Sequence, residues 1–597
     1  MRTSRAALAL LAIGAAVRIW GWASHDALFL DELFLALNLR ERSLLEMLTP
    51  LAYGQNAPVG WLLLQKVVTS VFGDGAHALH LVSLLASLAS LALMWALSRR
   101  LLSGAWALVP LAAVVFGPFL IWQGIQLKQY SFDVAVTLVL LLMALRVHES
   151  RGEGGLLPLG VAGVVAIWFS MPAIFVLAGV GTALFFRLLP RREAHGPRHL
   201  AVLVAIGAVW LATFALNYAV FLSAADEVDW LVDYWASGFL PWPPTGVGDL
   251  RWFYDIAVGA MERPLGFWRL GLPALLLVLL GVALPSIRRP SRRAASDAEG
   301  TTTSRGYRPP ALVWAPVLVT LGAAVAQAYP FRERLILFLV PSLAILLGRG
   351  VEGLAGRLPA GRALASAVAA GLLLVPAGIV MLWLPRGGLP VASDTRLLFD
   401  TLATVARPGD VVVVDHRTSY AARWYGLPPG VVGIDAPEEW SMAERMAAIR
   451  STLAALDESR AWIVIADVRL APAPPLGTAL ASDVASRRFT FDATWDWVDE
   501  GLGWWAPLPP LDDAVPTGWV RVSTIEVKGA VAFAVEREGP RSLATEAGGP
   551  GLVVALPSFE IGRDLPNRLE VLDGDVARRH IDPELLLDEP DELHDAE

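Results

Sequence analysis

The stretch ALHLVSLLASLASLALMWAL, residues 78–97, is twenty residues long, contains no Asp, Glu, Lys or Arg, and is followed by Ser98, Arg99 and Arg100. A helix of about 20 apolar residues can cross the roughly 30 Å hydrocarbon core of a bilayer. Similar runs recur between Ala6 and Trp383, and 55% of the 597 residues are hydrophobic against 17% charged. The sequence therefore predicts a polytopic α-helical protein, multi-pass in the plasma membrane.

Arginine clusters indicate the orientation, because positively charged residues beside membrane helices remain cytoplasmic. The clusters are Arg2 and Arg5, Arg99 and Arg100, Arg146 and Arg151, the group Arg187, Arg191, Arg192 and Arg198, the group 288–308, and Arg349, Arg357 and Arg362. If all of these arginine clusters lie on the cytoplasmic side, the chain has about 11 transmembrane helices. These are Ala6 to Trp22, Ala78 to Leu97, Ala105 to Ile121, Phe132 to Val147, Leu156 to Ser170, Ala173 to Phe186, Leu200 to Leu222, Phe267 to Ile287, Ala311 to Ala328, Leu335 to Leu347 and Ala363 to Trp383. An odd number places the N-terminus in the cytoplasm and the C-terminal domain outside the cell.

Two segments are expected to form large outer loops. In the first, residues 25–76, the apolar run Val59 to Phe72 is too short to cross and is interrupted by Lys66. It predicts an amphipathic helix at the membrane interface. The second, residues 223–266, is rich in Trp, Tyr and Phe, as interfacial segments are.

The chain divides into three parts by composition. Residues 1–385 are the membrane domain, residues 386–537 read as an extracytoplasmic α/β domain, and residues 538–597 form a Gly- and Pro-rich acidic tail that we expect to be largely disordered. In the α/β domain, strands are predicted at Val411 to Val414, Val431 to Ile434 and Trp462 to Ala466, a helix at Pro437 to Leu456, and a hairpin at Ile525 to Val535. Five tryptophans are expected to pack against the membrane domain or stack on a glycan, namely Trp495, Trp497, Trp504, Trp505 and Trp519.

Several classes of function have no support in the sequence. The chain has no cysteine, which excludes disulfides, thiolate metal sites and a cysteine nucleophile. Its net charge of -8 is concentrated in the C-terminal part, above all in Asp582 to Glu597, and says little about partners. A nucleic-acid partner is not expected. The α/β domain lacks Gly-x-Gly-x-x-Gly, so nucleotide binding is not indicated.

Ionisable residues gather at the predicted outer ends of the helices, where their cost in a membrane makes them candidates for function. They are Asp31 and Glu32 after the first helix, Lys128 and Asp133 at the start of the fourth, and Arg332, Glu333 and Arg334 at the start of the tenth. Arg18, one turn from the outer end of the first helix, is expected to extend toward the membrane surface instead.

Three motifs in this order carry a resemblance. They are Phe29-Leu30-Asp31-Glu32 with Gln55-Asn56-Ala57-Pro58-Val59-Gly60-Trp61 and Gly73-Asp74-Gly75, then Lys128-Gln129-Tyr130-Ser131-Phe132-Asp133, then Tyr329-Pro330-Phe331-Arg332-Glu333-Arg334 with Phe338-Leu339-Val340-Pro341. The chain from Met1 to Trp383 resembles the C-type (GT-C) polyprenyl-phosphate-sugar glycosyltransferases, within them the protein O-mannosyltransferase and aminoarabinose transferase group (glycosyltransferase families 39 and 83). It departs from many relatives at Asn56, where they have a histidine.

The resemblance implies a bacterial cell-envelope enzyme that transfers a hexose or pentose, with inversion, from a polyprenyl-phosphate donor to an extracytoplasmic hydroxyl of a lipid, polysaccharide or protein. The implied catalytic residues are Asp31 as the base, Asp133 to orient a substrate, and Glu32. Lys128, Arg332 and Arg334 would bind the donor phosphate, and Gln55, Asn56, Tyr130 and Tyr329 would bind substrate. No cofactor and no metal-ligand set is implied, although the sequence leaves a divalent metal open.

Other interpretations remain open from the sequence alone. Asp31, Glu32 and Asp133 could be acids at helix N-termini, and Arg332 to Arg334 could be an interfacial anchor with an internal ion pair. Glu32 could pair with an arginine, since adjacent helical side chains diverge by about 100°. The chain could also be a transporter or flippase of lipid-linked sugars, or a catalytically inactive membrane scaffold.

Overall fold

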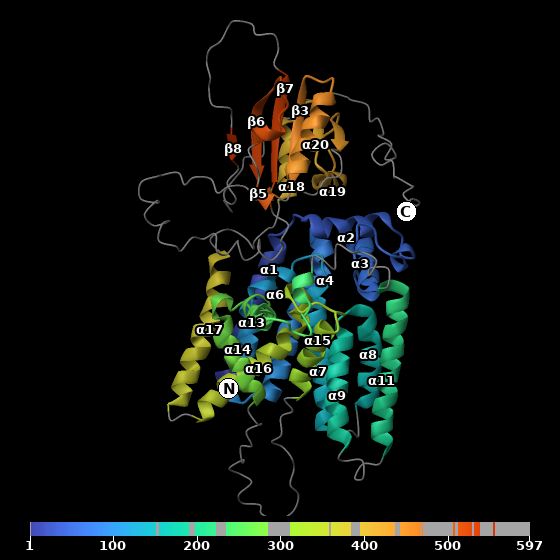
Figure 1. Ribbon diagram of the computed structural model, residues 1–597. Coiled ribbons are helices and arrows are strands. Elements are labelled where there is room, and N and C mark those ends of the chain that lie inside the picture. The colour runs from blue at the N-terminus through green and yellow to red at the C-terminus, as the bar shows by residue number, and fades with distance from the viewer. Residues whose placement is uncertain are drawn as a thin grey trace, which may run out of the picture. The chain divides into compact units, whose positions relative to one another are not determined.

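The computed structural model contains a bundle of membrane helices and a mixed β-sheet (Figure 1). It describes residues 2–150, 155–189, 197–222, 235–283, 311–357, 360–383, 394–435, 442–466, 468–469, 506–507, 511–527, 530–537 and 553–555. Within these residues, six helices are long and apolar enough to cross a membrane, and six shorter apolar helices accompany them. The chain is thus a polytopic membrane protein, and the count of about 11 crossings stays a prediction.

The bundle is built from apolar helices that pack on one another through a large shared core. Its helices are α1 (Arg2–Ala23), α4 (Ala76–Leu101), α5 (Leu108–Phe116), α6 (Pro118–Gln123), α7 (Tyr130–Glu149), α8 (Leu156–Phe169), α9 (Ala173–Leu188), α11 (Pro197–Asn217) with the π-helical turn η4 (Tyr218–Leu222), α14 (Gly271–Ala283), α15 (Ala311–Val325), α16 (Val340–Arg357) and α17 (Gly361–Trp383). Short 3-10 turns lie beside them at η2 (Gly104–Ala107), η7 (Trp268–Leu270) and η8 (Glu333–Leu339).

Two predicted crossings are not single α-helices. The predicted helix Ala105 to Ile121 consists of η2, α5 and α6, with a break at Gly117 where Pro118 begins α6. The predicted crossing Leu335 to Leu347 begins in η8 and becomes α-helical only at Val340, next to Pro341. Proline lacks an N–H and clashes with the preceding turn, so both breaks occur where a proline interrupts the α-helical hydrogen bonds.

Arg18 does not extend to the membrane surface, and that expectation was wrong. It is 1% exposed, and its guanidinium donates to the carbonyls of Val114 at 2.8 Å and Val115 at 3.2 Å. The Val114 carbonyl would normally accept from the fourth residue on, but that residue is Pro118. Arg18 therefore caps the end of α5 inside the bundle.

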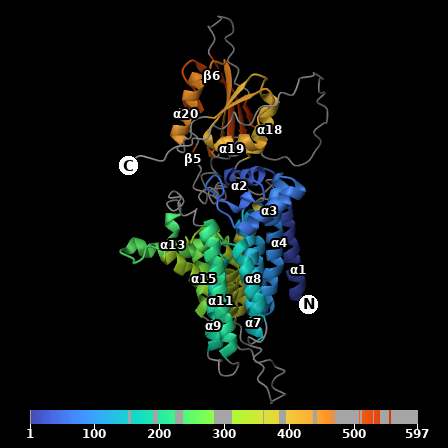
Figure 2. The ribbon, with the colours of Figure 1, turned by 90° about the vertical axis from the view of Figure 1, so that its right-hand side faces the viewer.

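The outer loop folds into short helices at one end of the bundle, the first of which runs across the direction of the bundle helices (Figures 1 and 2). They are α2 (Leu30–Glu41), η1 (Glu46–Leu48) and α3 (Val59–Phe72), the last with the bounds of the predicted interfacial helix. Trp61 of α3 is fully buried. The loop is thus a packed layer that can hold side chains in fixed positions. A second outer segment contains η6 (Ala236–Gly238) and α13 (Val247–Glu262).

The C-terminal part forms a six-stranded sheet with the order β2-β1-β3-β7-β6-β8. Its strands are β1 (Val411–Val414), β2 (Val432–Asp435), β3 (Arg460–Ala466), β6 (Trp519–Val527), β7 (Ala530–Arg537) and β8 (Val553–Ala555); β4 (Val468–Arg469) and β5 (Ala506–Pro507) form a separate pair, and η10 (Leu511–Ala514) precedes β6. Strands β1, β2 and β3 are parallel, and β7 is antiparallel to both β3 and β6. Alternate residues along β1 face opposite sides: Val412 and Val414 share a core with α18 (Thr395–Val405) and α19 (His416–Tyr425), and Val411 and Val413 share one with α20 (Met442–Ala455).

The sequence predicted β1, β2, β3 and the hairpin of β6 and β7, whereas several other elements were not expected. Helix α19 was not expected, and β8 lies inside the tail that was expected to be largely disordered. The predicted helix Pro437 to Leu456 appears as α20, and the residues before Met442 lie outside the described part. Trp519 packs in the sheet core rather than against the membrane domain, whereas Trp495, Trp497, Trp504 and Trp505 lie outside the described residues.

Candidate active site

Asp31 sits in the first turn of α2, after Phe29 as the N-terminal cap. The helix starts there because the Glu32 carboxylate accepts a hydrogen bond from the Phe29 N–H at 3.3 Å, which satisfies one of the free amides of the first turn. Adjacent helical residues point about 100° apart, so Asp31 and Glu32 face different surroundings.

The Asp31 carboxylate holds two cations, one on each oxygen. Oδ1 accepts from Lys128 Nζ at 2.9 Å, and Oδ2 accepts from Arg334 Nη1 at 2.9 Å. Lys128 Nζ also donates to Gln55 Oε1 at 3.0 Å. These four residues come from the outer loop, the segment before α7 and η8, and we call them the Asp31 cluster. The structure thus brings together four predicted site residues from distant parts of the chain.

The Asp31 cluster is partly shielded from solvent, which strengthens its electrostatics. Its side chains are 23% exposed at Asp31, 13% at Arg334 and 7% at Lys128. Burial opposes ionisation of Asp31, but the charges and hydrogen bonds of Lys128 and Arg334 outweigh it and hold the pKa of Asp31 below its ordinary value. Burial also lowers the pKa of Lys128, although the charge of Asp31 opposes that effect. The cluster has one negatively charged side chain and two positively charged ones, so one further negative charge would balance it.

Aromatic rings lie against the guanidinium of Arg334. Its Cζ is 5.4 Å from the centre of the Trp235 ring and 5.8 Å from that of Tyr130. Such cation–π contacts fix the direction of an arginine without neutralising its charge. Tyr130 was a predicted site residue. Trp235 was not singled out for the site, because its position in an aromatic-rich loop suggested only a membrane interface.

Glu32 does not pair with an arginine, and that alternative was wrong. Its carboxylate accepts from the Leu127 N–H at 2.6 Å and lies 2.9 Å from His80 Nε2 of α4. Both side chains are fully buried. Glu32 therefore supports the cluster indirectly, because it holds the backbone at Leu127, next to Lys128.

Arg332 is directed away from the Asp31 cluster. Its guanidinium donates to Glu333 Oε1 at 2.9 Å and to Ser237 Oγ, and Glu333 also accepts from Arg263 at 2.5 Å. Among the described residues, no hydrogen bond or ion pair joins Arg332 to Asp31. Both arginines were expected to bind donor phosphate, with at least one of them beside Asp31; in the structure Arg334 contacts Asp31 and Arg332 contacts Glu333.

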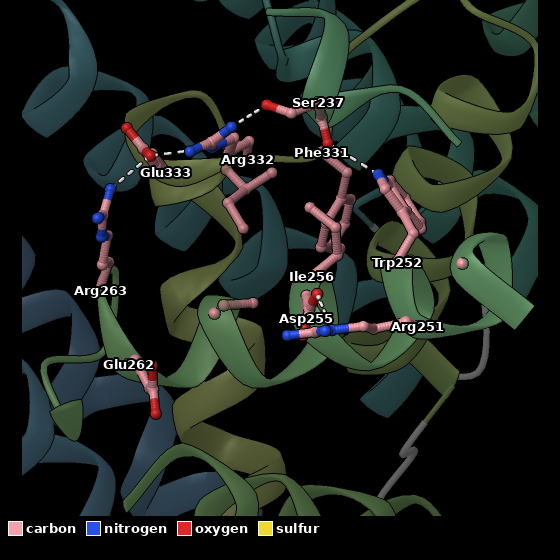
Figure 3. Close-up of a pocket in the computed structure, with 14 residues that line it drawn as sticks. Ser237, Arg251, Trp252, Asp255, Ile256, Glu262, Arg263, Phe331, Arg332 and Glu333 are labelled. Atoms are coloured by element: carbon pink, nitrogen blue, oxygen red, sulfur yellow. Dashed lines mark hydrogen bonds and ion pairs between the residues drawn. The ribbon is translucent and has the colours of Figure 1, made fainter. Parts of the chain in front are cut away.

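A cavity of about 510 Å³ lies between α13 and η8, next to this ion-paired group (Figure 3). Arg332, Glu333 and Phe331 line it from one side, and Trp252 and Asp255 of α13 from the other. Aromatic faces combined with charged and hydroxyl groups are suited to a polar ligand with an apolar face, such as a sugar. No motif in the sequence predicted this cavity, since its two walls are far apart in the chain.

Three other predicted residues, Asp133, Tyr329 and Asn56, are not joined to Asp31 by a hydrogen bond or ion pair within the described residues. Asp133 is buried near the start of α7. The burial of Tyr329, with a smaller contribution from the charge of Asp133, raises the pKa of Tyr329 well above its ordinary value. Tyr329 donates its hydroxyl proton to the Leu335 carbonyl at 2.8 Å. Asn56 is half-buried just before α3.

Comparison with known protein families adds to this geometry. Residues 56–216 match the family of dolichyl-phosphate-mannose-protein mannosyltransferases. The resemblance to C-type polyprenyl-phosphate-sugar glycosyltransferases is thereby confirmed over that segment, which includes Lys128, Tyr130 and Asp133. No curated protein matches the chain in sequence.

Solved structures with a similar fold have low sequence identity. ArnT from Cupriavidus metallidurans is 13% identical in the apo state, covering 78% of this chain and 94% of that one, with a TM-score of 0.42. The same protein bound to undecaprenyl phosphate is 12% identical, covering 88% and 97%, with a TM-score of 0.44. The Archaeoglobus fulgidus oligosaccharyltransferase in complex with Zn and sulfate is 11% identical, covering 83% and 70%, with a TM-score of 0.39.

Proposed function

We propose that this protein is an inverting membrane glycosyltransferase that moves a sugar from a polyprenyl-phosphate donor to a hydroxyl of an extracytoplasmic lipid, polysaccharide or protein. The observation that carries the proposal is the Asp31 carboxylate held between Lys128 and Arg334 in a largely buried site. One candidate base and two candidate phosphate ligands are the minimum set for this reaction. The match of residues 56–216 to a family of lipid-phosphate-sugar transferases supports the same class.

The reaction is a single displacement at the anomeric carbon of the sugar. The acceptor oxygen forms a bond to this carbon while the bond from the carbon to the phosphate oxygen breaks, and Asp31 takes the acceptor proton. Polyprenyl phosphate leaves with the bonding electrons. It needs no strong acid, because Lys128 and Arg334 stabilise its charge. Attack opposite the leaving group inverts the configuration.

Donor binding prepares Asp31 to act as a base. A carboxylate held by two cations is a weak base, since its pKa lies below the ordinary value. A phosphate that binds Lys128 and Arg334 competes with Asp31 for the same donors. Sharing the two cations with phosphate raises the proton affinity of Asp31 only when the donor is present. Gln55 keeps Lys128 in place through its 3.0 Å hydrogen bond during this exchange.

The cavity between α13 and η8 is the candidate acceptor site in this scheme. Arg332 and Glu333 line the cavity, and the next residue, Arg334, contacts Asp31. An acceptor held against Trp252 and Phe331 would thus lie beside the donor phosphate site, with Arg332 contacting acceptor rather than donor. In this scheme Asp133 and Tyr329 line the part of the site that holds the donor sugar. Asn56 lies at the entrance to the site, in the first outer loop.

The proposal includes an orientation that follows from the arginine clusters. About 11 crossings place the N-terminus in the cytoplasm, and both the Asp31 cluster and residues 386–537 outside. A transporter would be expected to carry its ionisable groups at mid-membrane between repeated halves. The Asp31 cluster is instead built from segments at helix ends, which favours the enzyme.

The test is chemical analysis of a deletion strain. Loss of the gene should cause a polyprenyl-phosphate sugar to accumulate and a glycan to disappear from the cell envelope, and purified protein should restore transfer in vitro. Unchanged levels of every polyprenyl-phosphate sugar would contradict the proposal. Accumulation only on the cytoplasmic side would instead support a flippase.

A further inference from the structure

Behind the Asp31 cluster, three buried side chains from three segments converge: His25 after α1, Glu32 of α2 and His80 of α4. One ligand atom from each residue lies within 4.8 Å of the others. Glu32 and His80 are fully buried, and His25 is 4% exposed. We propose that these residues bind one divalent transition-metal ion, Zn²⁺ by its ligand chemistry.

The charge of Glu32 provides the first argument. A carboxylate buried this completely needs a positive partner, because desolvation strongly penalises an isolated charge. The backbone N–H of Leu127 supplies a hydrogen bond but no charge. Among the described residues, the imidazoles of His25 and His80 converge on Glu32, and Lys128 contributes a further electrostatic attraction. A proton on one imidazole or a metal ion between the two would supply the nearest compensating charge.

The geometry of the two rings favours the metal ion. The ring centres of His25 and His80 lie 5.3 Å apart with a 27° angle between the planes, so two imidazolium charges would repel each other. His80 faces Glu32 through Nε2, 2.9 Å from the carboxylate, so an ion bound by both would take the place of the hydrogen bond between them. An imidazole nitrogen with its lone pair directed at the ion is the form of histidine that binds metals.

The ligand types indicate which metal. Two imidazole nitrogens and one carboxylate oxygen form a set that Zn²⁺ accepts, whereas Ca²⁺ and Mg²⁺ prefer oxygen ligands. Zn–N and Zn–O distances of about 2.0–2.2 Å place tetrahedral ligands about 3.4 Å apart. The 2.9 Å separation of His80 Nε2 and Glu32 Oε1 is close to that value. Only small side-chain rotations would bring a ring nitrogen of His25 within binding distance of the same ion.

The ion would act on position rather than on the reaction. Glu32 is the neighbour of Asp31, and Leu127, which Glu32 also holds, is the neighbour of Lys128. A metal on Glu32 would therefore fix both halves of the Asp31–Lys128 pair and tie α2 to α4. The residues that contact the ion would be positioning residues.

The experiment measures metal content in the full-length protein, purified in detergent through a tag without histidines. After chelation and incubation with Zn²⁺, elemental analysis should find about one ion per chain, and Co²⁺ in its place should give the visible absorption of a low-coordinate site. His80→Gln and His25→Gln should each lose most of the bound metal. His77→Gln is the matched control, because His77 lies on the same helix but is exposed and outside the cluster.

Two outcomes overturn the proposal. Wild-type protein that takes up no stoichiometric Zn²⁺ or Co²⁺ would show that the three residues form a hydrogen-bonded network only, and so would a His80→Gln variant that keeps its metal. Should that variant fail to fold, the wild type still decides: Zn²⁺ must raise the Tm of the chelated protein saturably at one ion per chain. Metal content is measured without turnover, so a failure here is separate from a failure of the proposed transferase activity.

Discussion

Arg334 Nη1 donates to Asp31 Oδ2 at 2.9 Å, although 303 positions separate the two residues in the chain. With Lys128 on the other oxygen, this contact makes Asp31 the junction of the outer loop, the start of α7 and η8. Each residue of the junction has a different expected role, so substitutions at these residues should impair the reaction in different ways.

Replacement of Asp31 by Asn should abolish turnover without preventing donor binding. The amide keeps the size of the carboxylate but cannot accept a proton, and general-base catalysis is typically worth about 10²- to 10⁴-fold. We expect kcat to fall at least about a hundredfold, measured with purified protein and a polyprenyl-phosphate-sugar donor. A rate near that of the wild type would assign the base to another residue, with Asp133 the leading candidate.

The two arginines should separate donor from acceptor effects. Arg334→Ala removes a charge-assisted contact to phosphate, so it should weaken donor binding about tenfold or more and lower kcat as well. Arg332→Ala should raise the KM for the acceptor and leave the donor Kd nearly unchanged, because Arg332 lines the cavity. Titration of donor binding and acceptor kinetics on both variants tests this. Equal loss of donor binding in the two would refute the separation.

The Asp31 cluster should add an acid-sensitive component to stability. The pKa of Asp31 is lowered in the folded state, so its contribution is complete above the unfolded pKa of about 3.9 and is lost as the pH falls through the lower folded value. The Tm difference between wild type and Asp31→Asn should therefore be constant from about pH 7 to pH 5 and shrink only below about pH 4. A difference that already vanishes between pH 7 and pH 5 would speak against this ion pairing.

Arg18 should be a stability residue rather than a membrane anchor. Arg18→Met leaves the carbonyls of Val114 and Val115 without their donor in a buried site, which should cost about 2–4 kcal/mol of unfolding free energy. Thermal unfolding in detergent measures this, with the exposed Arg5→Met as the control. An unchanged Tm for Arg18→Met would contradict the capping role.

Membrane orientation can be tested with reporter fusions. A reporter after Arg386 should be extracytoplasmic and one within 291–308 cytoplasmic, because the arginine clusters remain inside. Those two positions lie outside the described residues, so this prediction rests on the sequence. The reverse result would move the Asp31 cluster to the cytoplasmic side and remove the basis for an extracytoplasmic acceptor.

The sequence by itself determined that the chain is a membrane protein, where its apolar runs lie, and that acids and bases gather at helix ends in the order Asp31, Lys128, Arg334. It also predicted strand β1 with its observed bounds. These properties are local: they depend on hydropathy, alternation and charge within short stretches, which the order of residues records directly.

Only the tertiary structure decided which of the neighbouring residues act together. Asp31 and Glu32 look equivalent in sequence, as do Arg332 and Arg334, yet in each pair only one side chain reaches the cluster. A rotation of about 100° per helical residue sends adjacent side chains to different partners, and those partners come from segments far away in the chain. The convergence of His25 and His80 on Glu32, and the cavity between α13 and η8, arise in the same way. Long-range packing fixes them, and no short stretch of sequence contains both sides of either site.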